Sequence, residues 1–178
     1  MNTKYLKMRS KIIRPILFVT ICSATLMACQ SPSVKEKIEN DEVVGFRSDD
    51  EAMNAAIAKA KKSFDLFVQA FQKPQKGYEG FALKLAYNTP DNSLEHIWIG
   101  NLNYANDQFT GVVHNSPVST KEVALGDTVV IDKQKISDWM YLDKGVLRGG
   151  YTIRAMRDQM SDPEKEEFNK TIDFTIED

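Results

Sequence analysis

Apolar residues at steps of three and four predict one long helix at the start of the globular part of the chain. Ser48 stands where an N-cap is expected, and Glu51 completes the spacing of a capping box. Pro74 and Gly77 mark the end of the helix. A helix with one apolar stripe most often covers a sheet. The stripe consists of Met53, Ile57, Ala60, Phe64, Phe67, Val68 and Phe71.

Beyond this helix, a period of two predicts short strands. Residues 81–87 alternate between large apolar and small or polar side chains, which is typical of a strand with one buried face. The next two strands, 94–100 and 108–114, are expected to pair around a turn near residue 104. That register sets Ile97 opposite Gly111 and Ile99 opposite Phe109. Further strands are predicted at 128–131, 136–141, 146–150 and, as a short edge strand, 172–176.

The stretch from Ile136 to Arg154 predicts strand, turn, strand and then a helix, at a place where sheet and helix meet. A last helix is expected after Ser161, because Pro163 and Glu164 follow at the spacing of a helix start. Together these elements predict an α+β fold. We expect a bent antiparallel sheet of five or six strands, packed by one long N-terminal helix and short C-terminal helices.

The N-terminus has the composition of an export signal. Residues 1–14 are basic, and residues 15–25 form an apolar run that is shorter than the ~20 residues needed to span a bilayer. The residues Leu-Met-Ala-Cys at 26–29 resemble the lipobox of bacterial lipoproteins, in which the cysteine is acylated and becomes the mature N-terminus. We expect a signal peptide over 1–28 and lipidation, palmitate included, at Cys29. The alternative is an ordinary secretory signal with an incidental cysteine.

Residues 29–48 are polar and are predicted to be a tether. A flexible chain of this length reaches ~25 Å, which would hold the domain clear of the lipid head groups. Gln30 follows Cys29. Because an aspartate at that position favours retention in the inner membrane, its absence favours the outer membrane. We expect a single domain over 49–178, joined to the membrane through the lipid and facing the periplasm.

The charge of the chain is uneven. Five basic residues lie before residue 29, and the rest of the chain has 18 Lys and Arg against 25 Asp and Glu, a net charge of −7. Such an acidic domain is a poor match for nucleic acid. Both cysteines, Cys22 and Cys29, precede the domain, which excludes a disulfide or a cysteine-based zinc site within it.

No stretch carries a recognisable catalytic motif, such as a phosphate loop, a nucleophile elbow or a metalloprotease helix. No cofactor or metal is predicted. His96 and His114 are expected on one face of neighbouring strands, but a zinc site needs a third ligand, which only a distant acid could supply. Asp138, between Ser137 and Trp139, is the carboxylate most expected to be partly buried. Its ordinary role is to bond backbone amides or to pair with an arginine.

Large amphipathic side chains gather around residues 138–154, where they are candidates for binding. Tryptophan, tyrosine and arginine are the favoured anchors of binding surfaces. Aromatic residues more often belong to a core, so the hypothesis is that this group forms or supports a contact surface. The candidates are Asp138, Trp139, Tyr141, Arg148, Tyr151 and Arg154.

Five segments carry a family resemblance. They are Glu-His-Ile-Trp at 95–98, Phe-Thr-Gly-Val at 109–112, Leu-Gly-Asp at 125–127, Ile-Ser-Asp-Trp-Met-Tyr at 136–141 and Gly-Gly-Tyr-Thr-Ile-Arg at 149–154. These segments resemble the YegJ-like family of bacterial proteins, a domain of unknown function, over roughly residues 51–174. The resemblance implies no activity and no catalytic residue. The Gly-Gly-Tyr-Thr segment also resembles an ending found in some small toxin-immunity proteins, which points to protein binding.

Three functions follow as hypotheses. The first is a non-enzymatic, envelope-anchored binding module. The alternatives are a hydrolase of envelope material, with Asp138 or His96 as its acid–base group, and an immunity-type inhibitor of a toxin. A cleft holding His96 and Asp138 within hydrogen-bond reach would favour the enzyme, whereas an exposed aromatic patch would favour the binding module.

Overall fold

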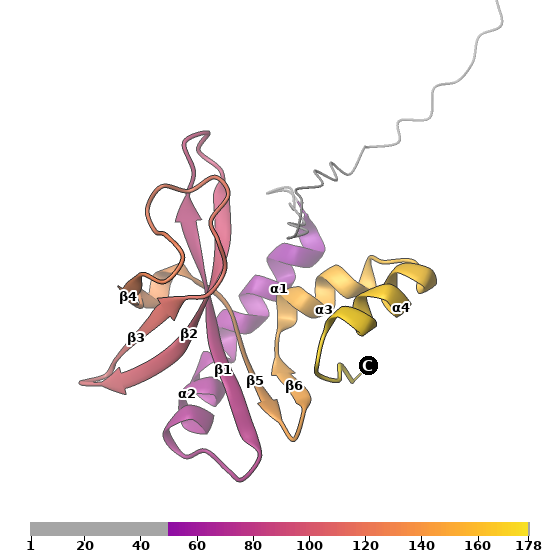
Figure 1. Cartoon of the computed structure of the whole chain (residues 1–178), viewed down its shortest axis with the longest axis horizontal. Coiled ribbons are helices and arrows are strands. Elements are labelled where there is room, and N and C mark those ends of the chain that lie inside the picture. The colour runs from indigo at the N-terminus through magenta and orange to yellow at the C-terminus, as the bar shows by residue number, and fades with distance from the viewer. Residues whose placement is uncertain (1–49, 178) are drawn as a thin grey trace, which may run out of the picture. The chain divides into compact units, whose positions relative to one another are not determined.

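The computed structural model describes residues 50–177, and the expected α+β class is confirmed (Figure 1). The predicted signal peptide, Cys29 and the tether lie outside the described residues. None of the helices in the described part of the chain is long and apolar enough to cross a membrane. The elements in chain order are α1 (Glu51–Lys62), α2 (Phe64–Gln72), β1 (Tyr78–Asn88), β2 (Leu94–Ala105), β3 (Gln108–Val113), β4 (Thr128–Val130), the 3-10 turn η1 (Lys133–Lys135), β5 (Ile136–Asp143), β6 (Val146–Gly149), α3 (Tyr151–Asp158) and α4 (Asp162–Thr171).

The six strands form one antiparallel sheet in the order β4-β3-β2-β1-β5-β6. β1 lies near the centre, where it pairs with β2 on one side and with β5 on the other. Helices α1 and α2 lie behind the sheet in Figure 1, against one of its faces. The two faces of the same strands therefore have different surroundings.

The covered face forms the hydrophobic core. Phe67 on α2 is 0% exposed, and its ring centroid lies 5.8 Å from those of Phe109 and Trp139. The indole N–H of Trp139 donates to the carbonyl of Ala60 at 3.0 Å, which ties β5 to α1. The alternating apolar residues of β1 and β2 complete this core, as their period of two predicts. They are Leu83, Leu85, Tyr87, Ile97 and Ile99.

The expectation of one long N-terminal helix is wrong, because the helix is divided at Ser63 into α1 and α2. The Ser63 hydroxyl donates to the carbonyl of Lys59 at 2.8 Å, and such a bond competes with the backbone ladder. The cap also differs from the expected one. Asp50 is the N-cap, and its carboxylate accepts from the backbone N–H of Met53 at 3.0 Å. Ser48 lies outside the described residues.

The predicted register of the β2–β3 hairpin is also wrong. The turn is at Asn106 and Asp107, which both have positive φ (52° and 59°), as in a tight two-residue hairpin. β2 therefore continues to Ala105, and Ile99 pairs with Val113 rather than with Phe109. A bulge that follows Gly100 shifts the pairing. A bulge reverses the alternation of faces, so extrapolation along the strand fails.

The C-terminal elements follow the prediction more closely. β5, β6 and α3 form the expected strand–turn–strand–helix unit. At α4 the predicted capping box is present, and the backbone N–H of Ser161 donates to the Glu164 carboxylate at 2.9 Å. In place of the expected edge strand, the tail makes an isolated parallel bridge between Thr175 and Val146.

Candidate binding groove

Small residues stand on β1 and β2 at the point where these two strands separate. The pairing of β1 with β2 ends at Leu83 and Ile99, so Ala82 and Gly100 stand where the two strands separate. Met140 on β5 pairs with Ala82 from the other side. Larger residues stand before and after Gly100 on β2, namely Trp98 and Leu102. The small residues at this point leave a trough between the separating strands.

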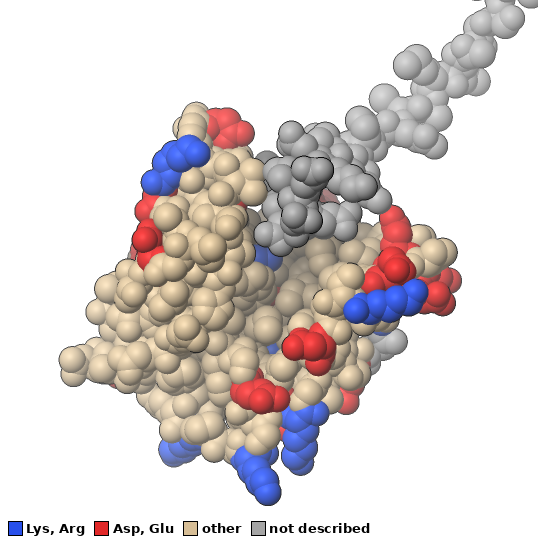
Figure 2. Space-filling model, viewed as in Figure 1, with Lys and Arg blue, Asp and Glu red and all other residues tan. Residues whose placement is uncertain are grey.

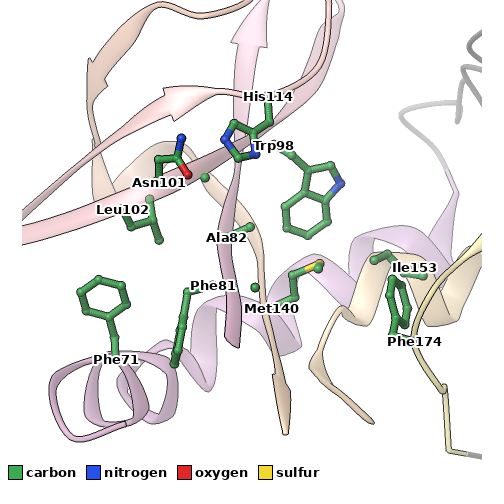
Figure 3. A pocket seen from close by; sticks show the side chains of 12 residues that line it. Phe71, Phe81, Ala82, Trp98, Asn101, Leu102, His114, Met140, Ile153 and Phe174 are labelled. Atoms are coloured by element: carbon green, nitrogen blue, oxygen red, sulfur yellow. The ribbon is translucent and has the colours of Figure 1, made fainter. Parts of the chain in front are cut away.

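This trough is a groove with a cavity volume of about 590 Å³, a size typical of small-molecule sites (Figure 3). Phe71 and Leu102 lie toward one end, and Ile153 and Phe174 lie toward the other. No charged residue is among those that line it. Figure 2 shows the same side of the molecule, where most charged residues lie at the margins and the surface over the strands is largely uncharged.

The edge of the groove depends on the glycine at position 100. A β-carbon there would lie 2.2 Å from Cε1 of His114, so any side chain would displace the imidazole ring. The backbone N–H of His114 donates to the carbonyl of Trp98 at 3.0 Å, which holds the two residues side by side. His114 and Asn101 contribute polar side chains to the groove lining, and Trp98 adds an indole N–H.

A hydrogen-bonded polar chain lies next to Trp98 on the same face. Lys84 on β1 faces Asp138 on β5, and its ammonium donates to the Thr152 hydroxyl at 3.2 Å. The Thr152 hydroxyl in turn donates to the Asp138 carboxylate at 2.7 Å. The ammonium also lies 5.2 Å from the centroid of the Trp98 ring. Burial lowers the pKa of Lys84, while the charge of Asp138 opposes that shift.

Asp138 is 0% exposed and caps α3 from the neighbouring strand. The N-cap position of α3 is Gly150, which has no side chain to accept the first N–H groups. The Asp138 carboxylate accepts instead from the backbone N–H groups of Tyr151 (3.1 Å) and Thr152 (2.8 Å), and also from that of Trp139 (2.8 Å). Burial raises the pKa of Asp138, and the hydrogen bonds from Thr152 oppose that shift. Bonding of backbone amides is one of the ordinary roles expected for this residue.

A close backbone approach completes this junction. Gly149 has φ of 72°, and a β-carbon there would lie 2.2 Å from the carbonyl oxygen of Trp139. The next N–H, that of Gly150, donates to the same oxygen at 2.8 Å. The segments 136–141 and 149–154 therefore act as one structural unit, because the backbone of each satisfies groups of the other.

His96 and Ser137 form a pair whose geometry does not activate the serine. Nδ1 of His96 lies 2.8 Å from the Ser137 hydroxyl, which also donates to the carbonyl of Lys84 at 3.2 Å. When the serine proton is directed to the Lys84 carbonyl, the imidazole donates to the serine instead of accepting its proton. The pKa of His96 is lowered to about 4, first by burial and then by the charges of Lys84 and Lys61.

The structure does not join the two residues proposed for acid–base chemistry. Within residues 50–177, no hydrogen bond links His96 to Asp138, and Asp138 already accepts four bonds. In the same part of the chain, no group of three or more His, Cys, Asp or Glu residues is arranged to hold a metal ion.

Two of the other candidate residues lie in or beside the core. Trp139 is 3% exposed, so it supports the sheet rather than forming a surface. Tyr141 is half-buried, and its ring stacks on Phe81 at 5.0 Å between centroids. Burial, together with a hydrogen bond to Tyr78, raises the pKa of Tyr141 to about 12.

The remaining candidates lie around the start of α3. Tyr151 packs edge-on against Trp139, with 5.6 Å between the ring centroids. Arg154 donates to the backbone carbonyls of Leu147 (2.8 Å) and Gly149 (3.1 Å). Arg148 lies further out, and its guanidinium is 3.3 Å from the Asp143 carboxylate. These residues brace the junction, whereas the groove is lined by others.

The groove itself depends on residues that the sequence pattern does not bring together. Ala82 and Trp98 are placed correctly on the polar faces of their strands, but Met140, Ile153 and Phe174 join them only through the sheet order and the packing of the C-terminal segment. The signal available in the sequence was a small residue on each of two neighbouring strands, namely Ala82 and Gly100.

The fold and the groove define a class: an α+β domain with one sheet face covered by helices and a groove where two neighbouring strands separate. The chain belongs to the family of uncharacterised proteins conserved in bacteria that is designated DUF2314, whose model matches residues 50–175. The expected resemblance to YegJ-like proteins is thereby confirmed.

Two relatives show how far the similarity extends. The chain is 38% identical over 114 residues to the uncharacterised protein YegJ of Escherichia coli K12, a match that covers 64% of this chain and 72% of that protein. It is 31% identical over 134 residues to a putative ankyrin repeat protein of Neisseria meningitidis serogroup B, covering 70% of this chain and 53% of the relative. The chain thus spans about half the length of the neisserial protein. No solved structure matches the chain significantly.

Proposed function

We propose that this protein is a lipid-anchored envelope protein that binds a ligand non-covalently in the groove between β1 and β2. The groove carries this proposal, because it has the volume of a ligand site and a lining that is mostly apolar. A few polar groups at the edge of an apolar cavity are the usual composition of such sites. Asn101 and His114 supply them here.

The hydrolase alternative finds less support in the geometry. A general acid or base must reach the proton that it transfers. Asp138 is buried and fully occupied by its donors, and the Ser137 hydroxyl is already bonded to a carbonyl.

Anchoring is the second part of the proposal. The lipobox at 26–29 supplies an acyl chain on Cys29, and the residue after it favours the outer membrane. Several acyl chains, at ~0.8 kcal/mol per buried methylene, make such an anchor stable. The test is Cys29→Ala, with labelled palmitate incorporation and membrane fractionation as readouts. We expect the variant to lose the label and to stay uncleaved. Labelling that persists in the variant, or wild-type chain found unprocessed in the cytosol, contradicts the anchor.

Occupation of the groove is tested by site-specific photocrosslinking in intact cells. A photoreactive residue replaces Met140 inside the groove, and the matched control replaces Lys62, which is exposed on α1 behind the sheet. We expect a discrete adduct, detected by intact mass or gel shift, from position 140 and none from position 62. No adduct at position 140, or the same adducts at both positions, would show that the groove is not a binding site.

A further inference from the structure

The groove opens at a split in the middle of the sheet. β1 and β2 pair from Asn88 and Leu94 as far as Leu83 and Ile99, and their remaining residues then follow different neighbours. β1 continues beside β5, and β2 continues beside β3. Since β1 and β2 are the two central strands of the order β4-β3-β2-β1-β5-β6, the split exposes strand edges that a continuous sheet would pair.

On the β1 side of the split, two residues have no partner in the sheet register of residues 50–177. The pairing with β5 shifts between Glu79 and Ala82, so Gly80 and Phe81 lie outside the ladder on that side. The register gives them no partner on β2 either. Gly80 has φ of 64°, a value that breaks the regular alternation of a strand. Both residues line the groove.

The β2 side of the split has the same feature. Its pairing with β3 shifts between Gly100 and Asn103, and Asn101, which lies between them, has φ of 44°. In the described part of the chain, the register therefore gives Asn101 and Leu102 no partner on β3 and none on β1. Both line the groove. Backbone N–H and C=O groups on its two sides are thus available to a ligand that can pair with both strands.

The side chains around the split indicate what such a ligand carries. Phe71 of α2 packs against the core on the helix-covered side, whereas Trp98 and Met140 belong to the other face (Figure 3). A strand placed between β1 and β2 would thus be covered on both of its faces, and strands of that kind are near-continuous apolar runs. The lining has no charged residue, and three residues of each strand contribute to it (80–82 and 100–102). Three extended residues span ~10 Å, so the matching run has about three residues.

Building on the proposed binding function, we infer that the groove receives an extended segment of a partner polypeptide, which inserts between β1 and β2 as an additional strand. One edge of the segment pairs with residues 80–81 and the other with residues 101–102, while about three consecutive apolar side chains pack against the lining. A hydrocarbon ligand would leave these backbone groups unpaired, and a buried polar group without a partner costs free energy. A peptide backbone has donors and acceptors along both edges, and it therefore matches the split.

The sequence of the inserted segment is tested by selection. The lipidated full chain, anchored in phosphatidylcholine vesicles, is presented to a phage library of random decapeptides, and vesicles alone are the control. We expect the selected peptides to share a run of about three apolar residues that is rich in valine and isoleucine and free of proline. Selected peptides without a common apolar run, or with proline inside that run, would overturn the inference.

The backbone pairing is tested on the wild-type protein with chemically altered peptides. A selected peptide is compared with two analogues, which are N-methylated at one or the other of two consecutive residues of the apolar run. Because successive N–H groups of a strand point to opposite neighbours, each methyl group should weaken binding at least tenfold in fluorescence anisotropy. Tolerance of one analogue would show that the peptide pairs with one strand only, and tolerance of both would show recognition by side chains alone. Either result would overturn insertion between two strands.

The position of the peptide is tested with a matched pair of variants. Ala82→Leu fills the groove and should weaken binding at least tenfold, whereas Ala105→Leu, at an exposed alanine of β2 outside the lining, should leave it unchanged. In the wild-type protein, the peptide should slow hydrogen exchange in segments 80–82 and 100–102 at least tenfold. Equal affinities of the two variants, or unchanged exchange in both segments, would place the peptide elsewhere and overturn the inference.

The crosslink from position 140 separates the two proposals. An adduct with another polypeptide, at a segment that contains the selected apolar run, supports both. An adduct of small-molecule mass retains the proposed binding function and overturns the peptide, and an adduct within the chain itself overturns the partner. Absence of both the crosslink and the selected run would remove the two proposals together.

Discussion

The two faces of the sheet are built from the same strands but differ in the kinds of side chain that they carry. On the covered face, Leu83, Ile97 and Ile99 are all 0% exposed, and they belong to the hydrophobic core together with residues of α1 and α2. On the open face, the neighbouring positions hold Ala82, Lys84, His96, Trp98 and Gly100, which are small, charged or amphipathic. A close-packed face contributes stability, whereas a face that keeps a groove gives up packing for access. Substitutions on the covered face are therefore expected to reduce stability, whereas substitutions on the open face are expected to reduce binding.

The largest contrast is expected between two aromatic residues. Phe67→Ala should lower the free energy of unfolding by about 4 kcal/mol, because it empties the centre of the aromatic cluster. Trp98→Ala on the open face should cost less than about 2 kcal/mol, since that side chain is only half-buried. Urea denaturation of both variants measures the difference. Equal losses would show that the open face is part of the core.

Asp138 sharpens the comparison, because it lies on the open face and yet holds the fold together. Asp138→Asn replaces an acceptor oxygen with a donor and leaves amides of α3 unpaired, so we expect a loss of about 3 kcal/mol. The control is Asp132→Asn, at an exposed aspartate that caps η1 through Gln134 and should cost less than about 1 kcal/mol. The assignment of Asp138 as the cap of α3 fails if the two variants unfold at the same urea concentration.

The open face should also give the protein a specific sensitivity to acid. The pKa of His96 is about 4 in the folded protein and near 6.5 when unfolded, so the unfolded state takes up the proton first. Stability is therefore lost as pH falls from 6.5 to 4, by about 2 kcal/mol once solvent screening is allowed for. His96→Gln should remove this part of the pH dependence. His114→Gln, at the other histidine, should retain it; a flat difference between wild type and His96→Gln across this range would contradict the shift.

The smallest effect is expected at the outer end of the junction. Arg148 makes ion pairs with Asp143 and Glu177 at a partly exposed site, so Arg148→Gln should change stability by less than about 0.5 kcal/mol. Arg154→Gln should cost about 1.5 kcal/mol, because it removes donors to the carbonyls of Leu147 and Gly149. Thermal unfolding compares the two variants. A larger loss of stability in Arg148→Gln than in Arg154→Gln would show that the exposed ion pairs stabilise the junction more than the hydrogen bonds of Arg154 do.

The covered face was predictable from the sequence, because its signal is local. The period of two in residues 81–87 and the apolar stripe through Phe64, Phe67 and Phe71 identify core positions without knowledge of which strand pairs with which. Two local features made the predicted helix length and hairpin register wrong. The side chain of Ser63 interrupts the helix, and the bulge after Gly100 moves the hairpin turn. In both cases a single residue changes the backbone while the apolar pattern continues unchanged.

The groove was not predictable, because it depends on contacts between distant segments. Its floor requires β5 to return beside β1 after three intervening strands, and its far wall requires α3 and the tail to fold back. The cap of α3 by Asp138 has the same character. The glycine at position 150 shows that a cap is missing locally, but it does not show which carboxylate replaces it.

That borrowed cap has a consequence for the order in which the chain folds. α3 has only eight residues and no side chain of its own to hold its first turn, so it should not form before β5 delivers Asp138 to it. Ala155→Gly within α3 should therefore speed unfolding and leave the folding rate unchanged, because the helix is absent from the rate-limiting transition state. A short helix of this kind forms only after the central strands have paired.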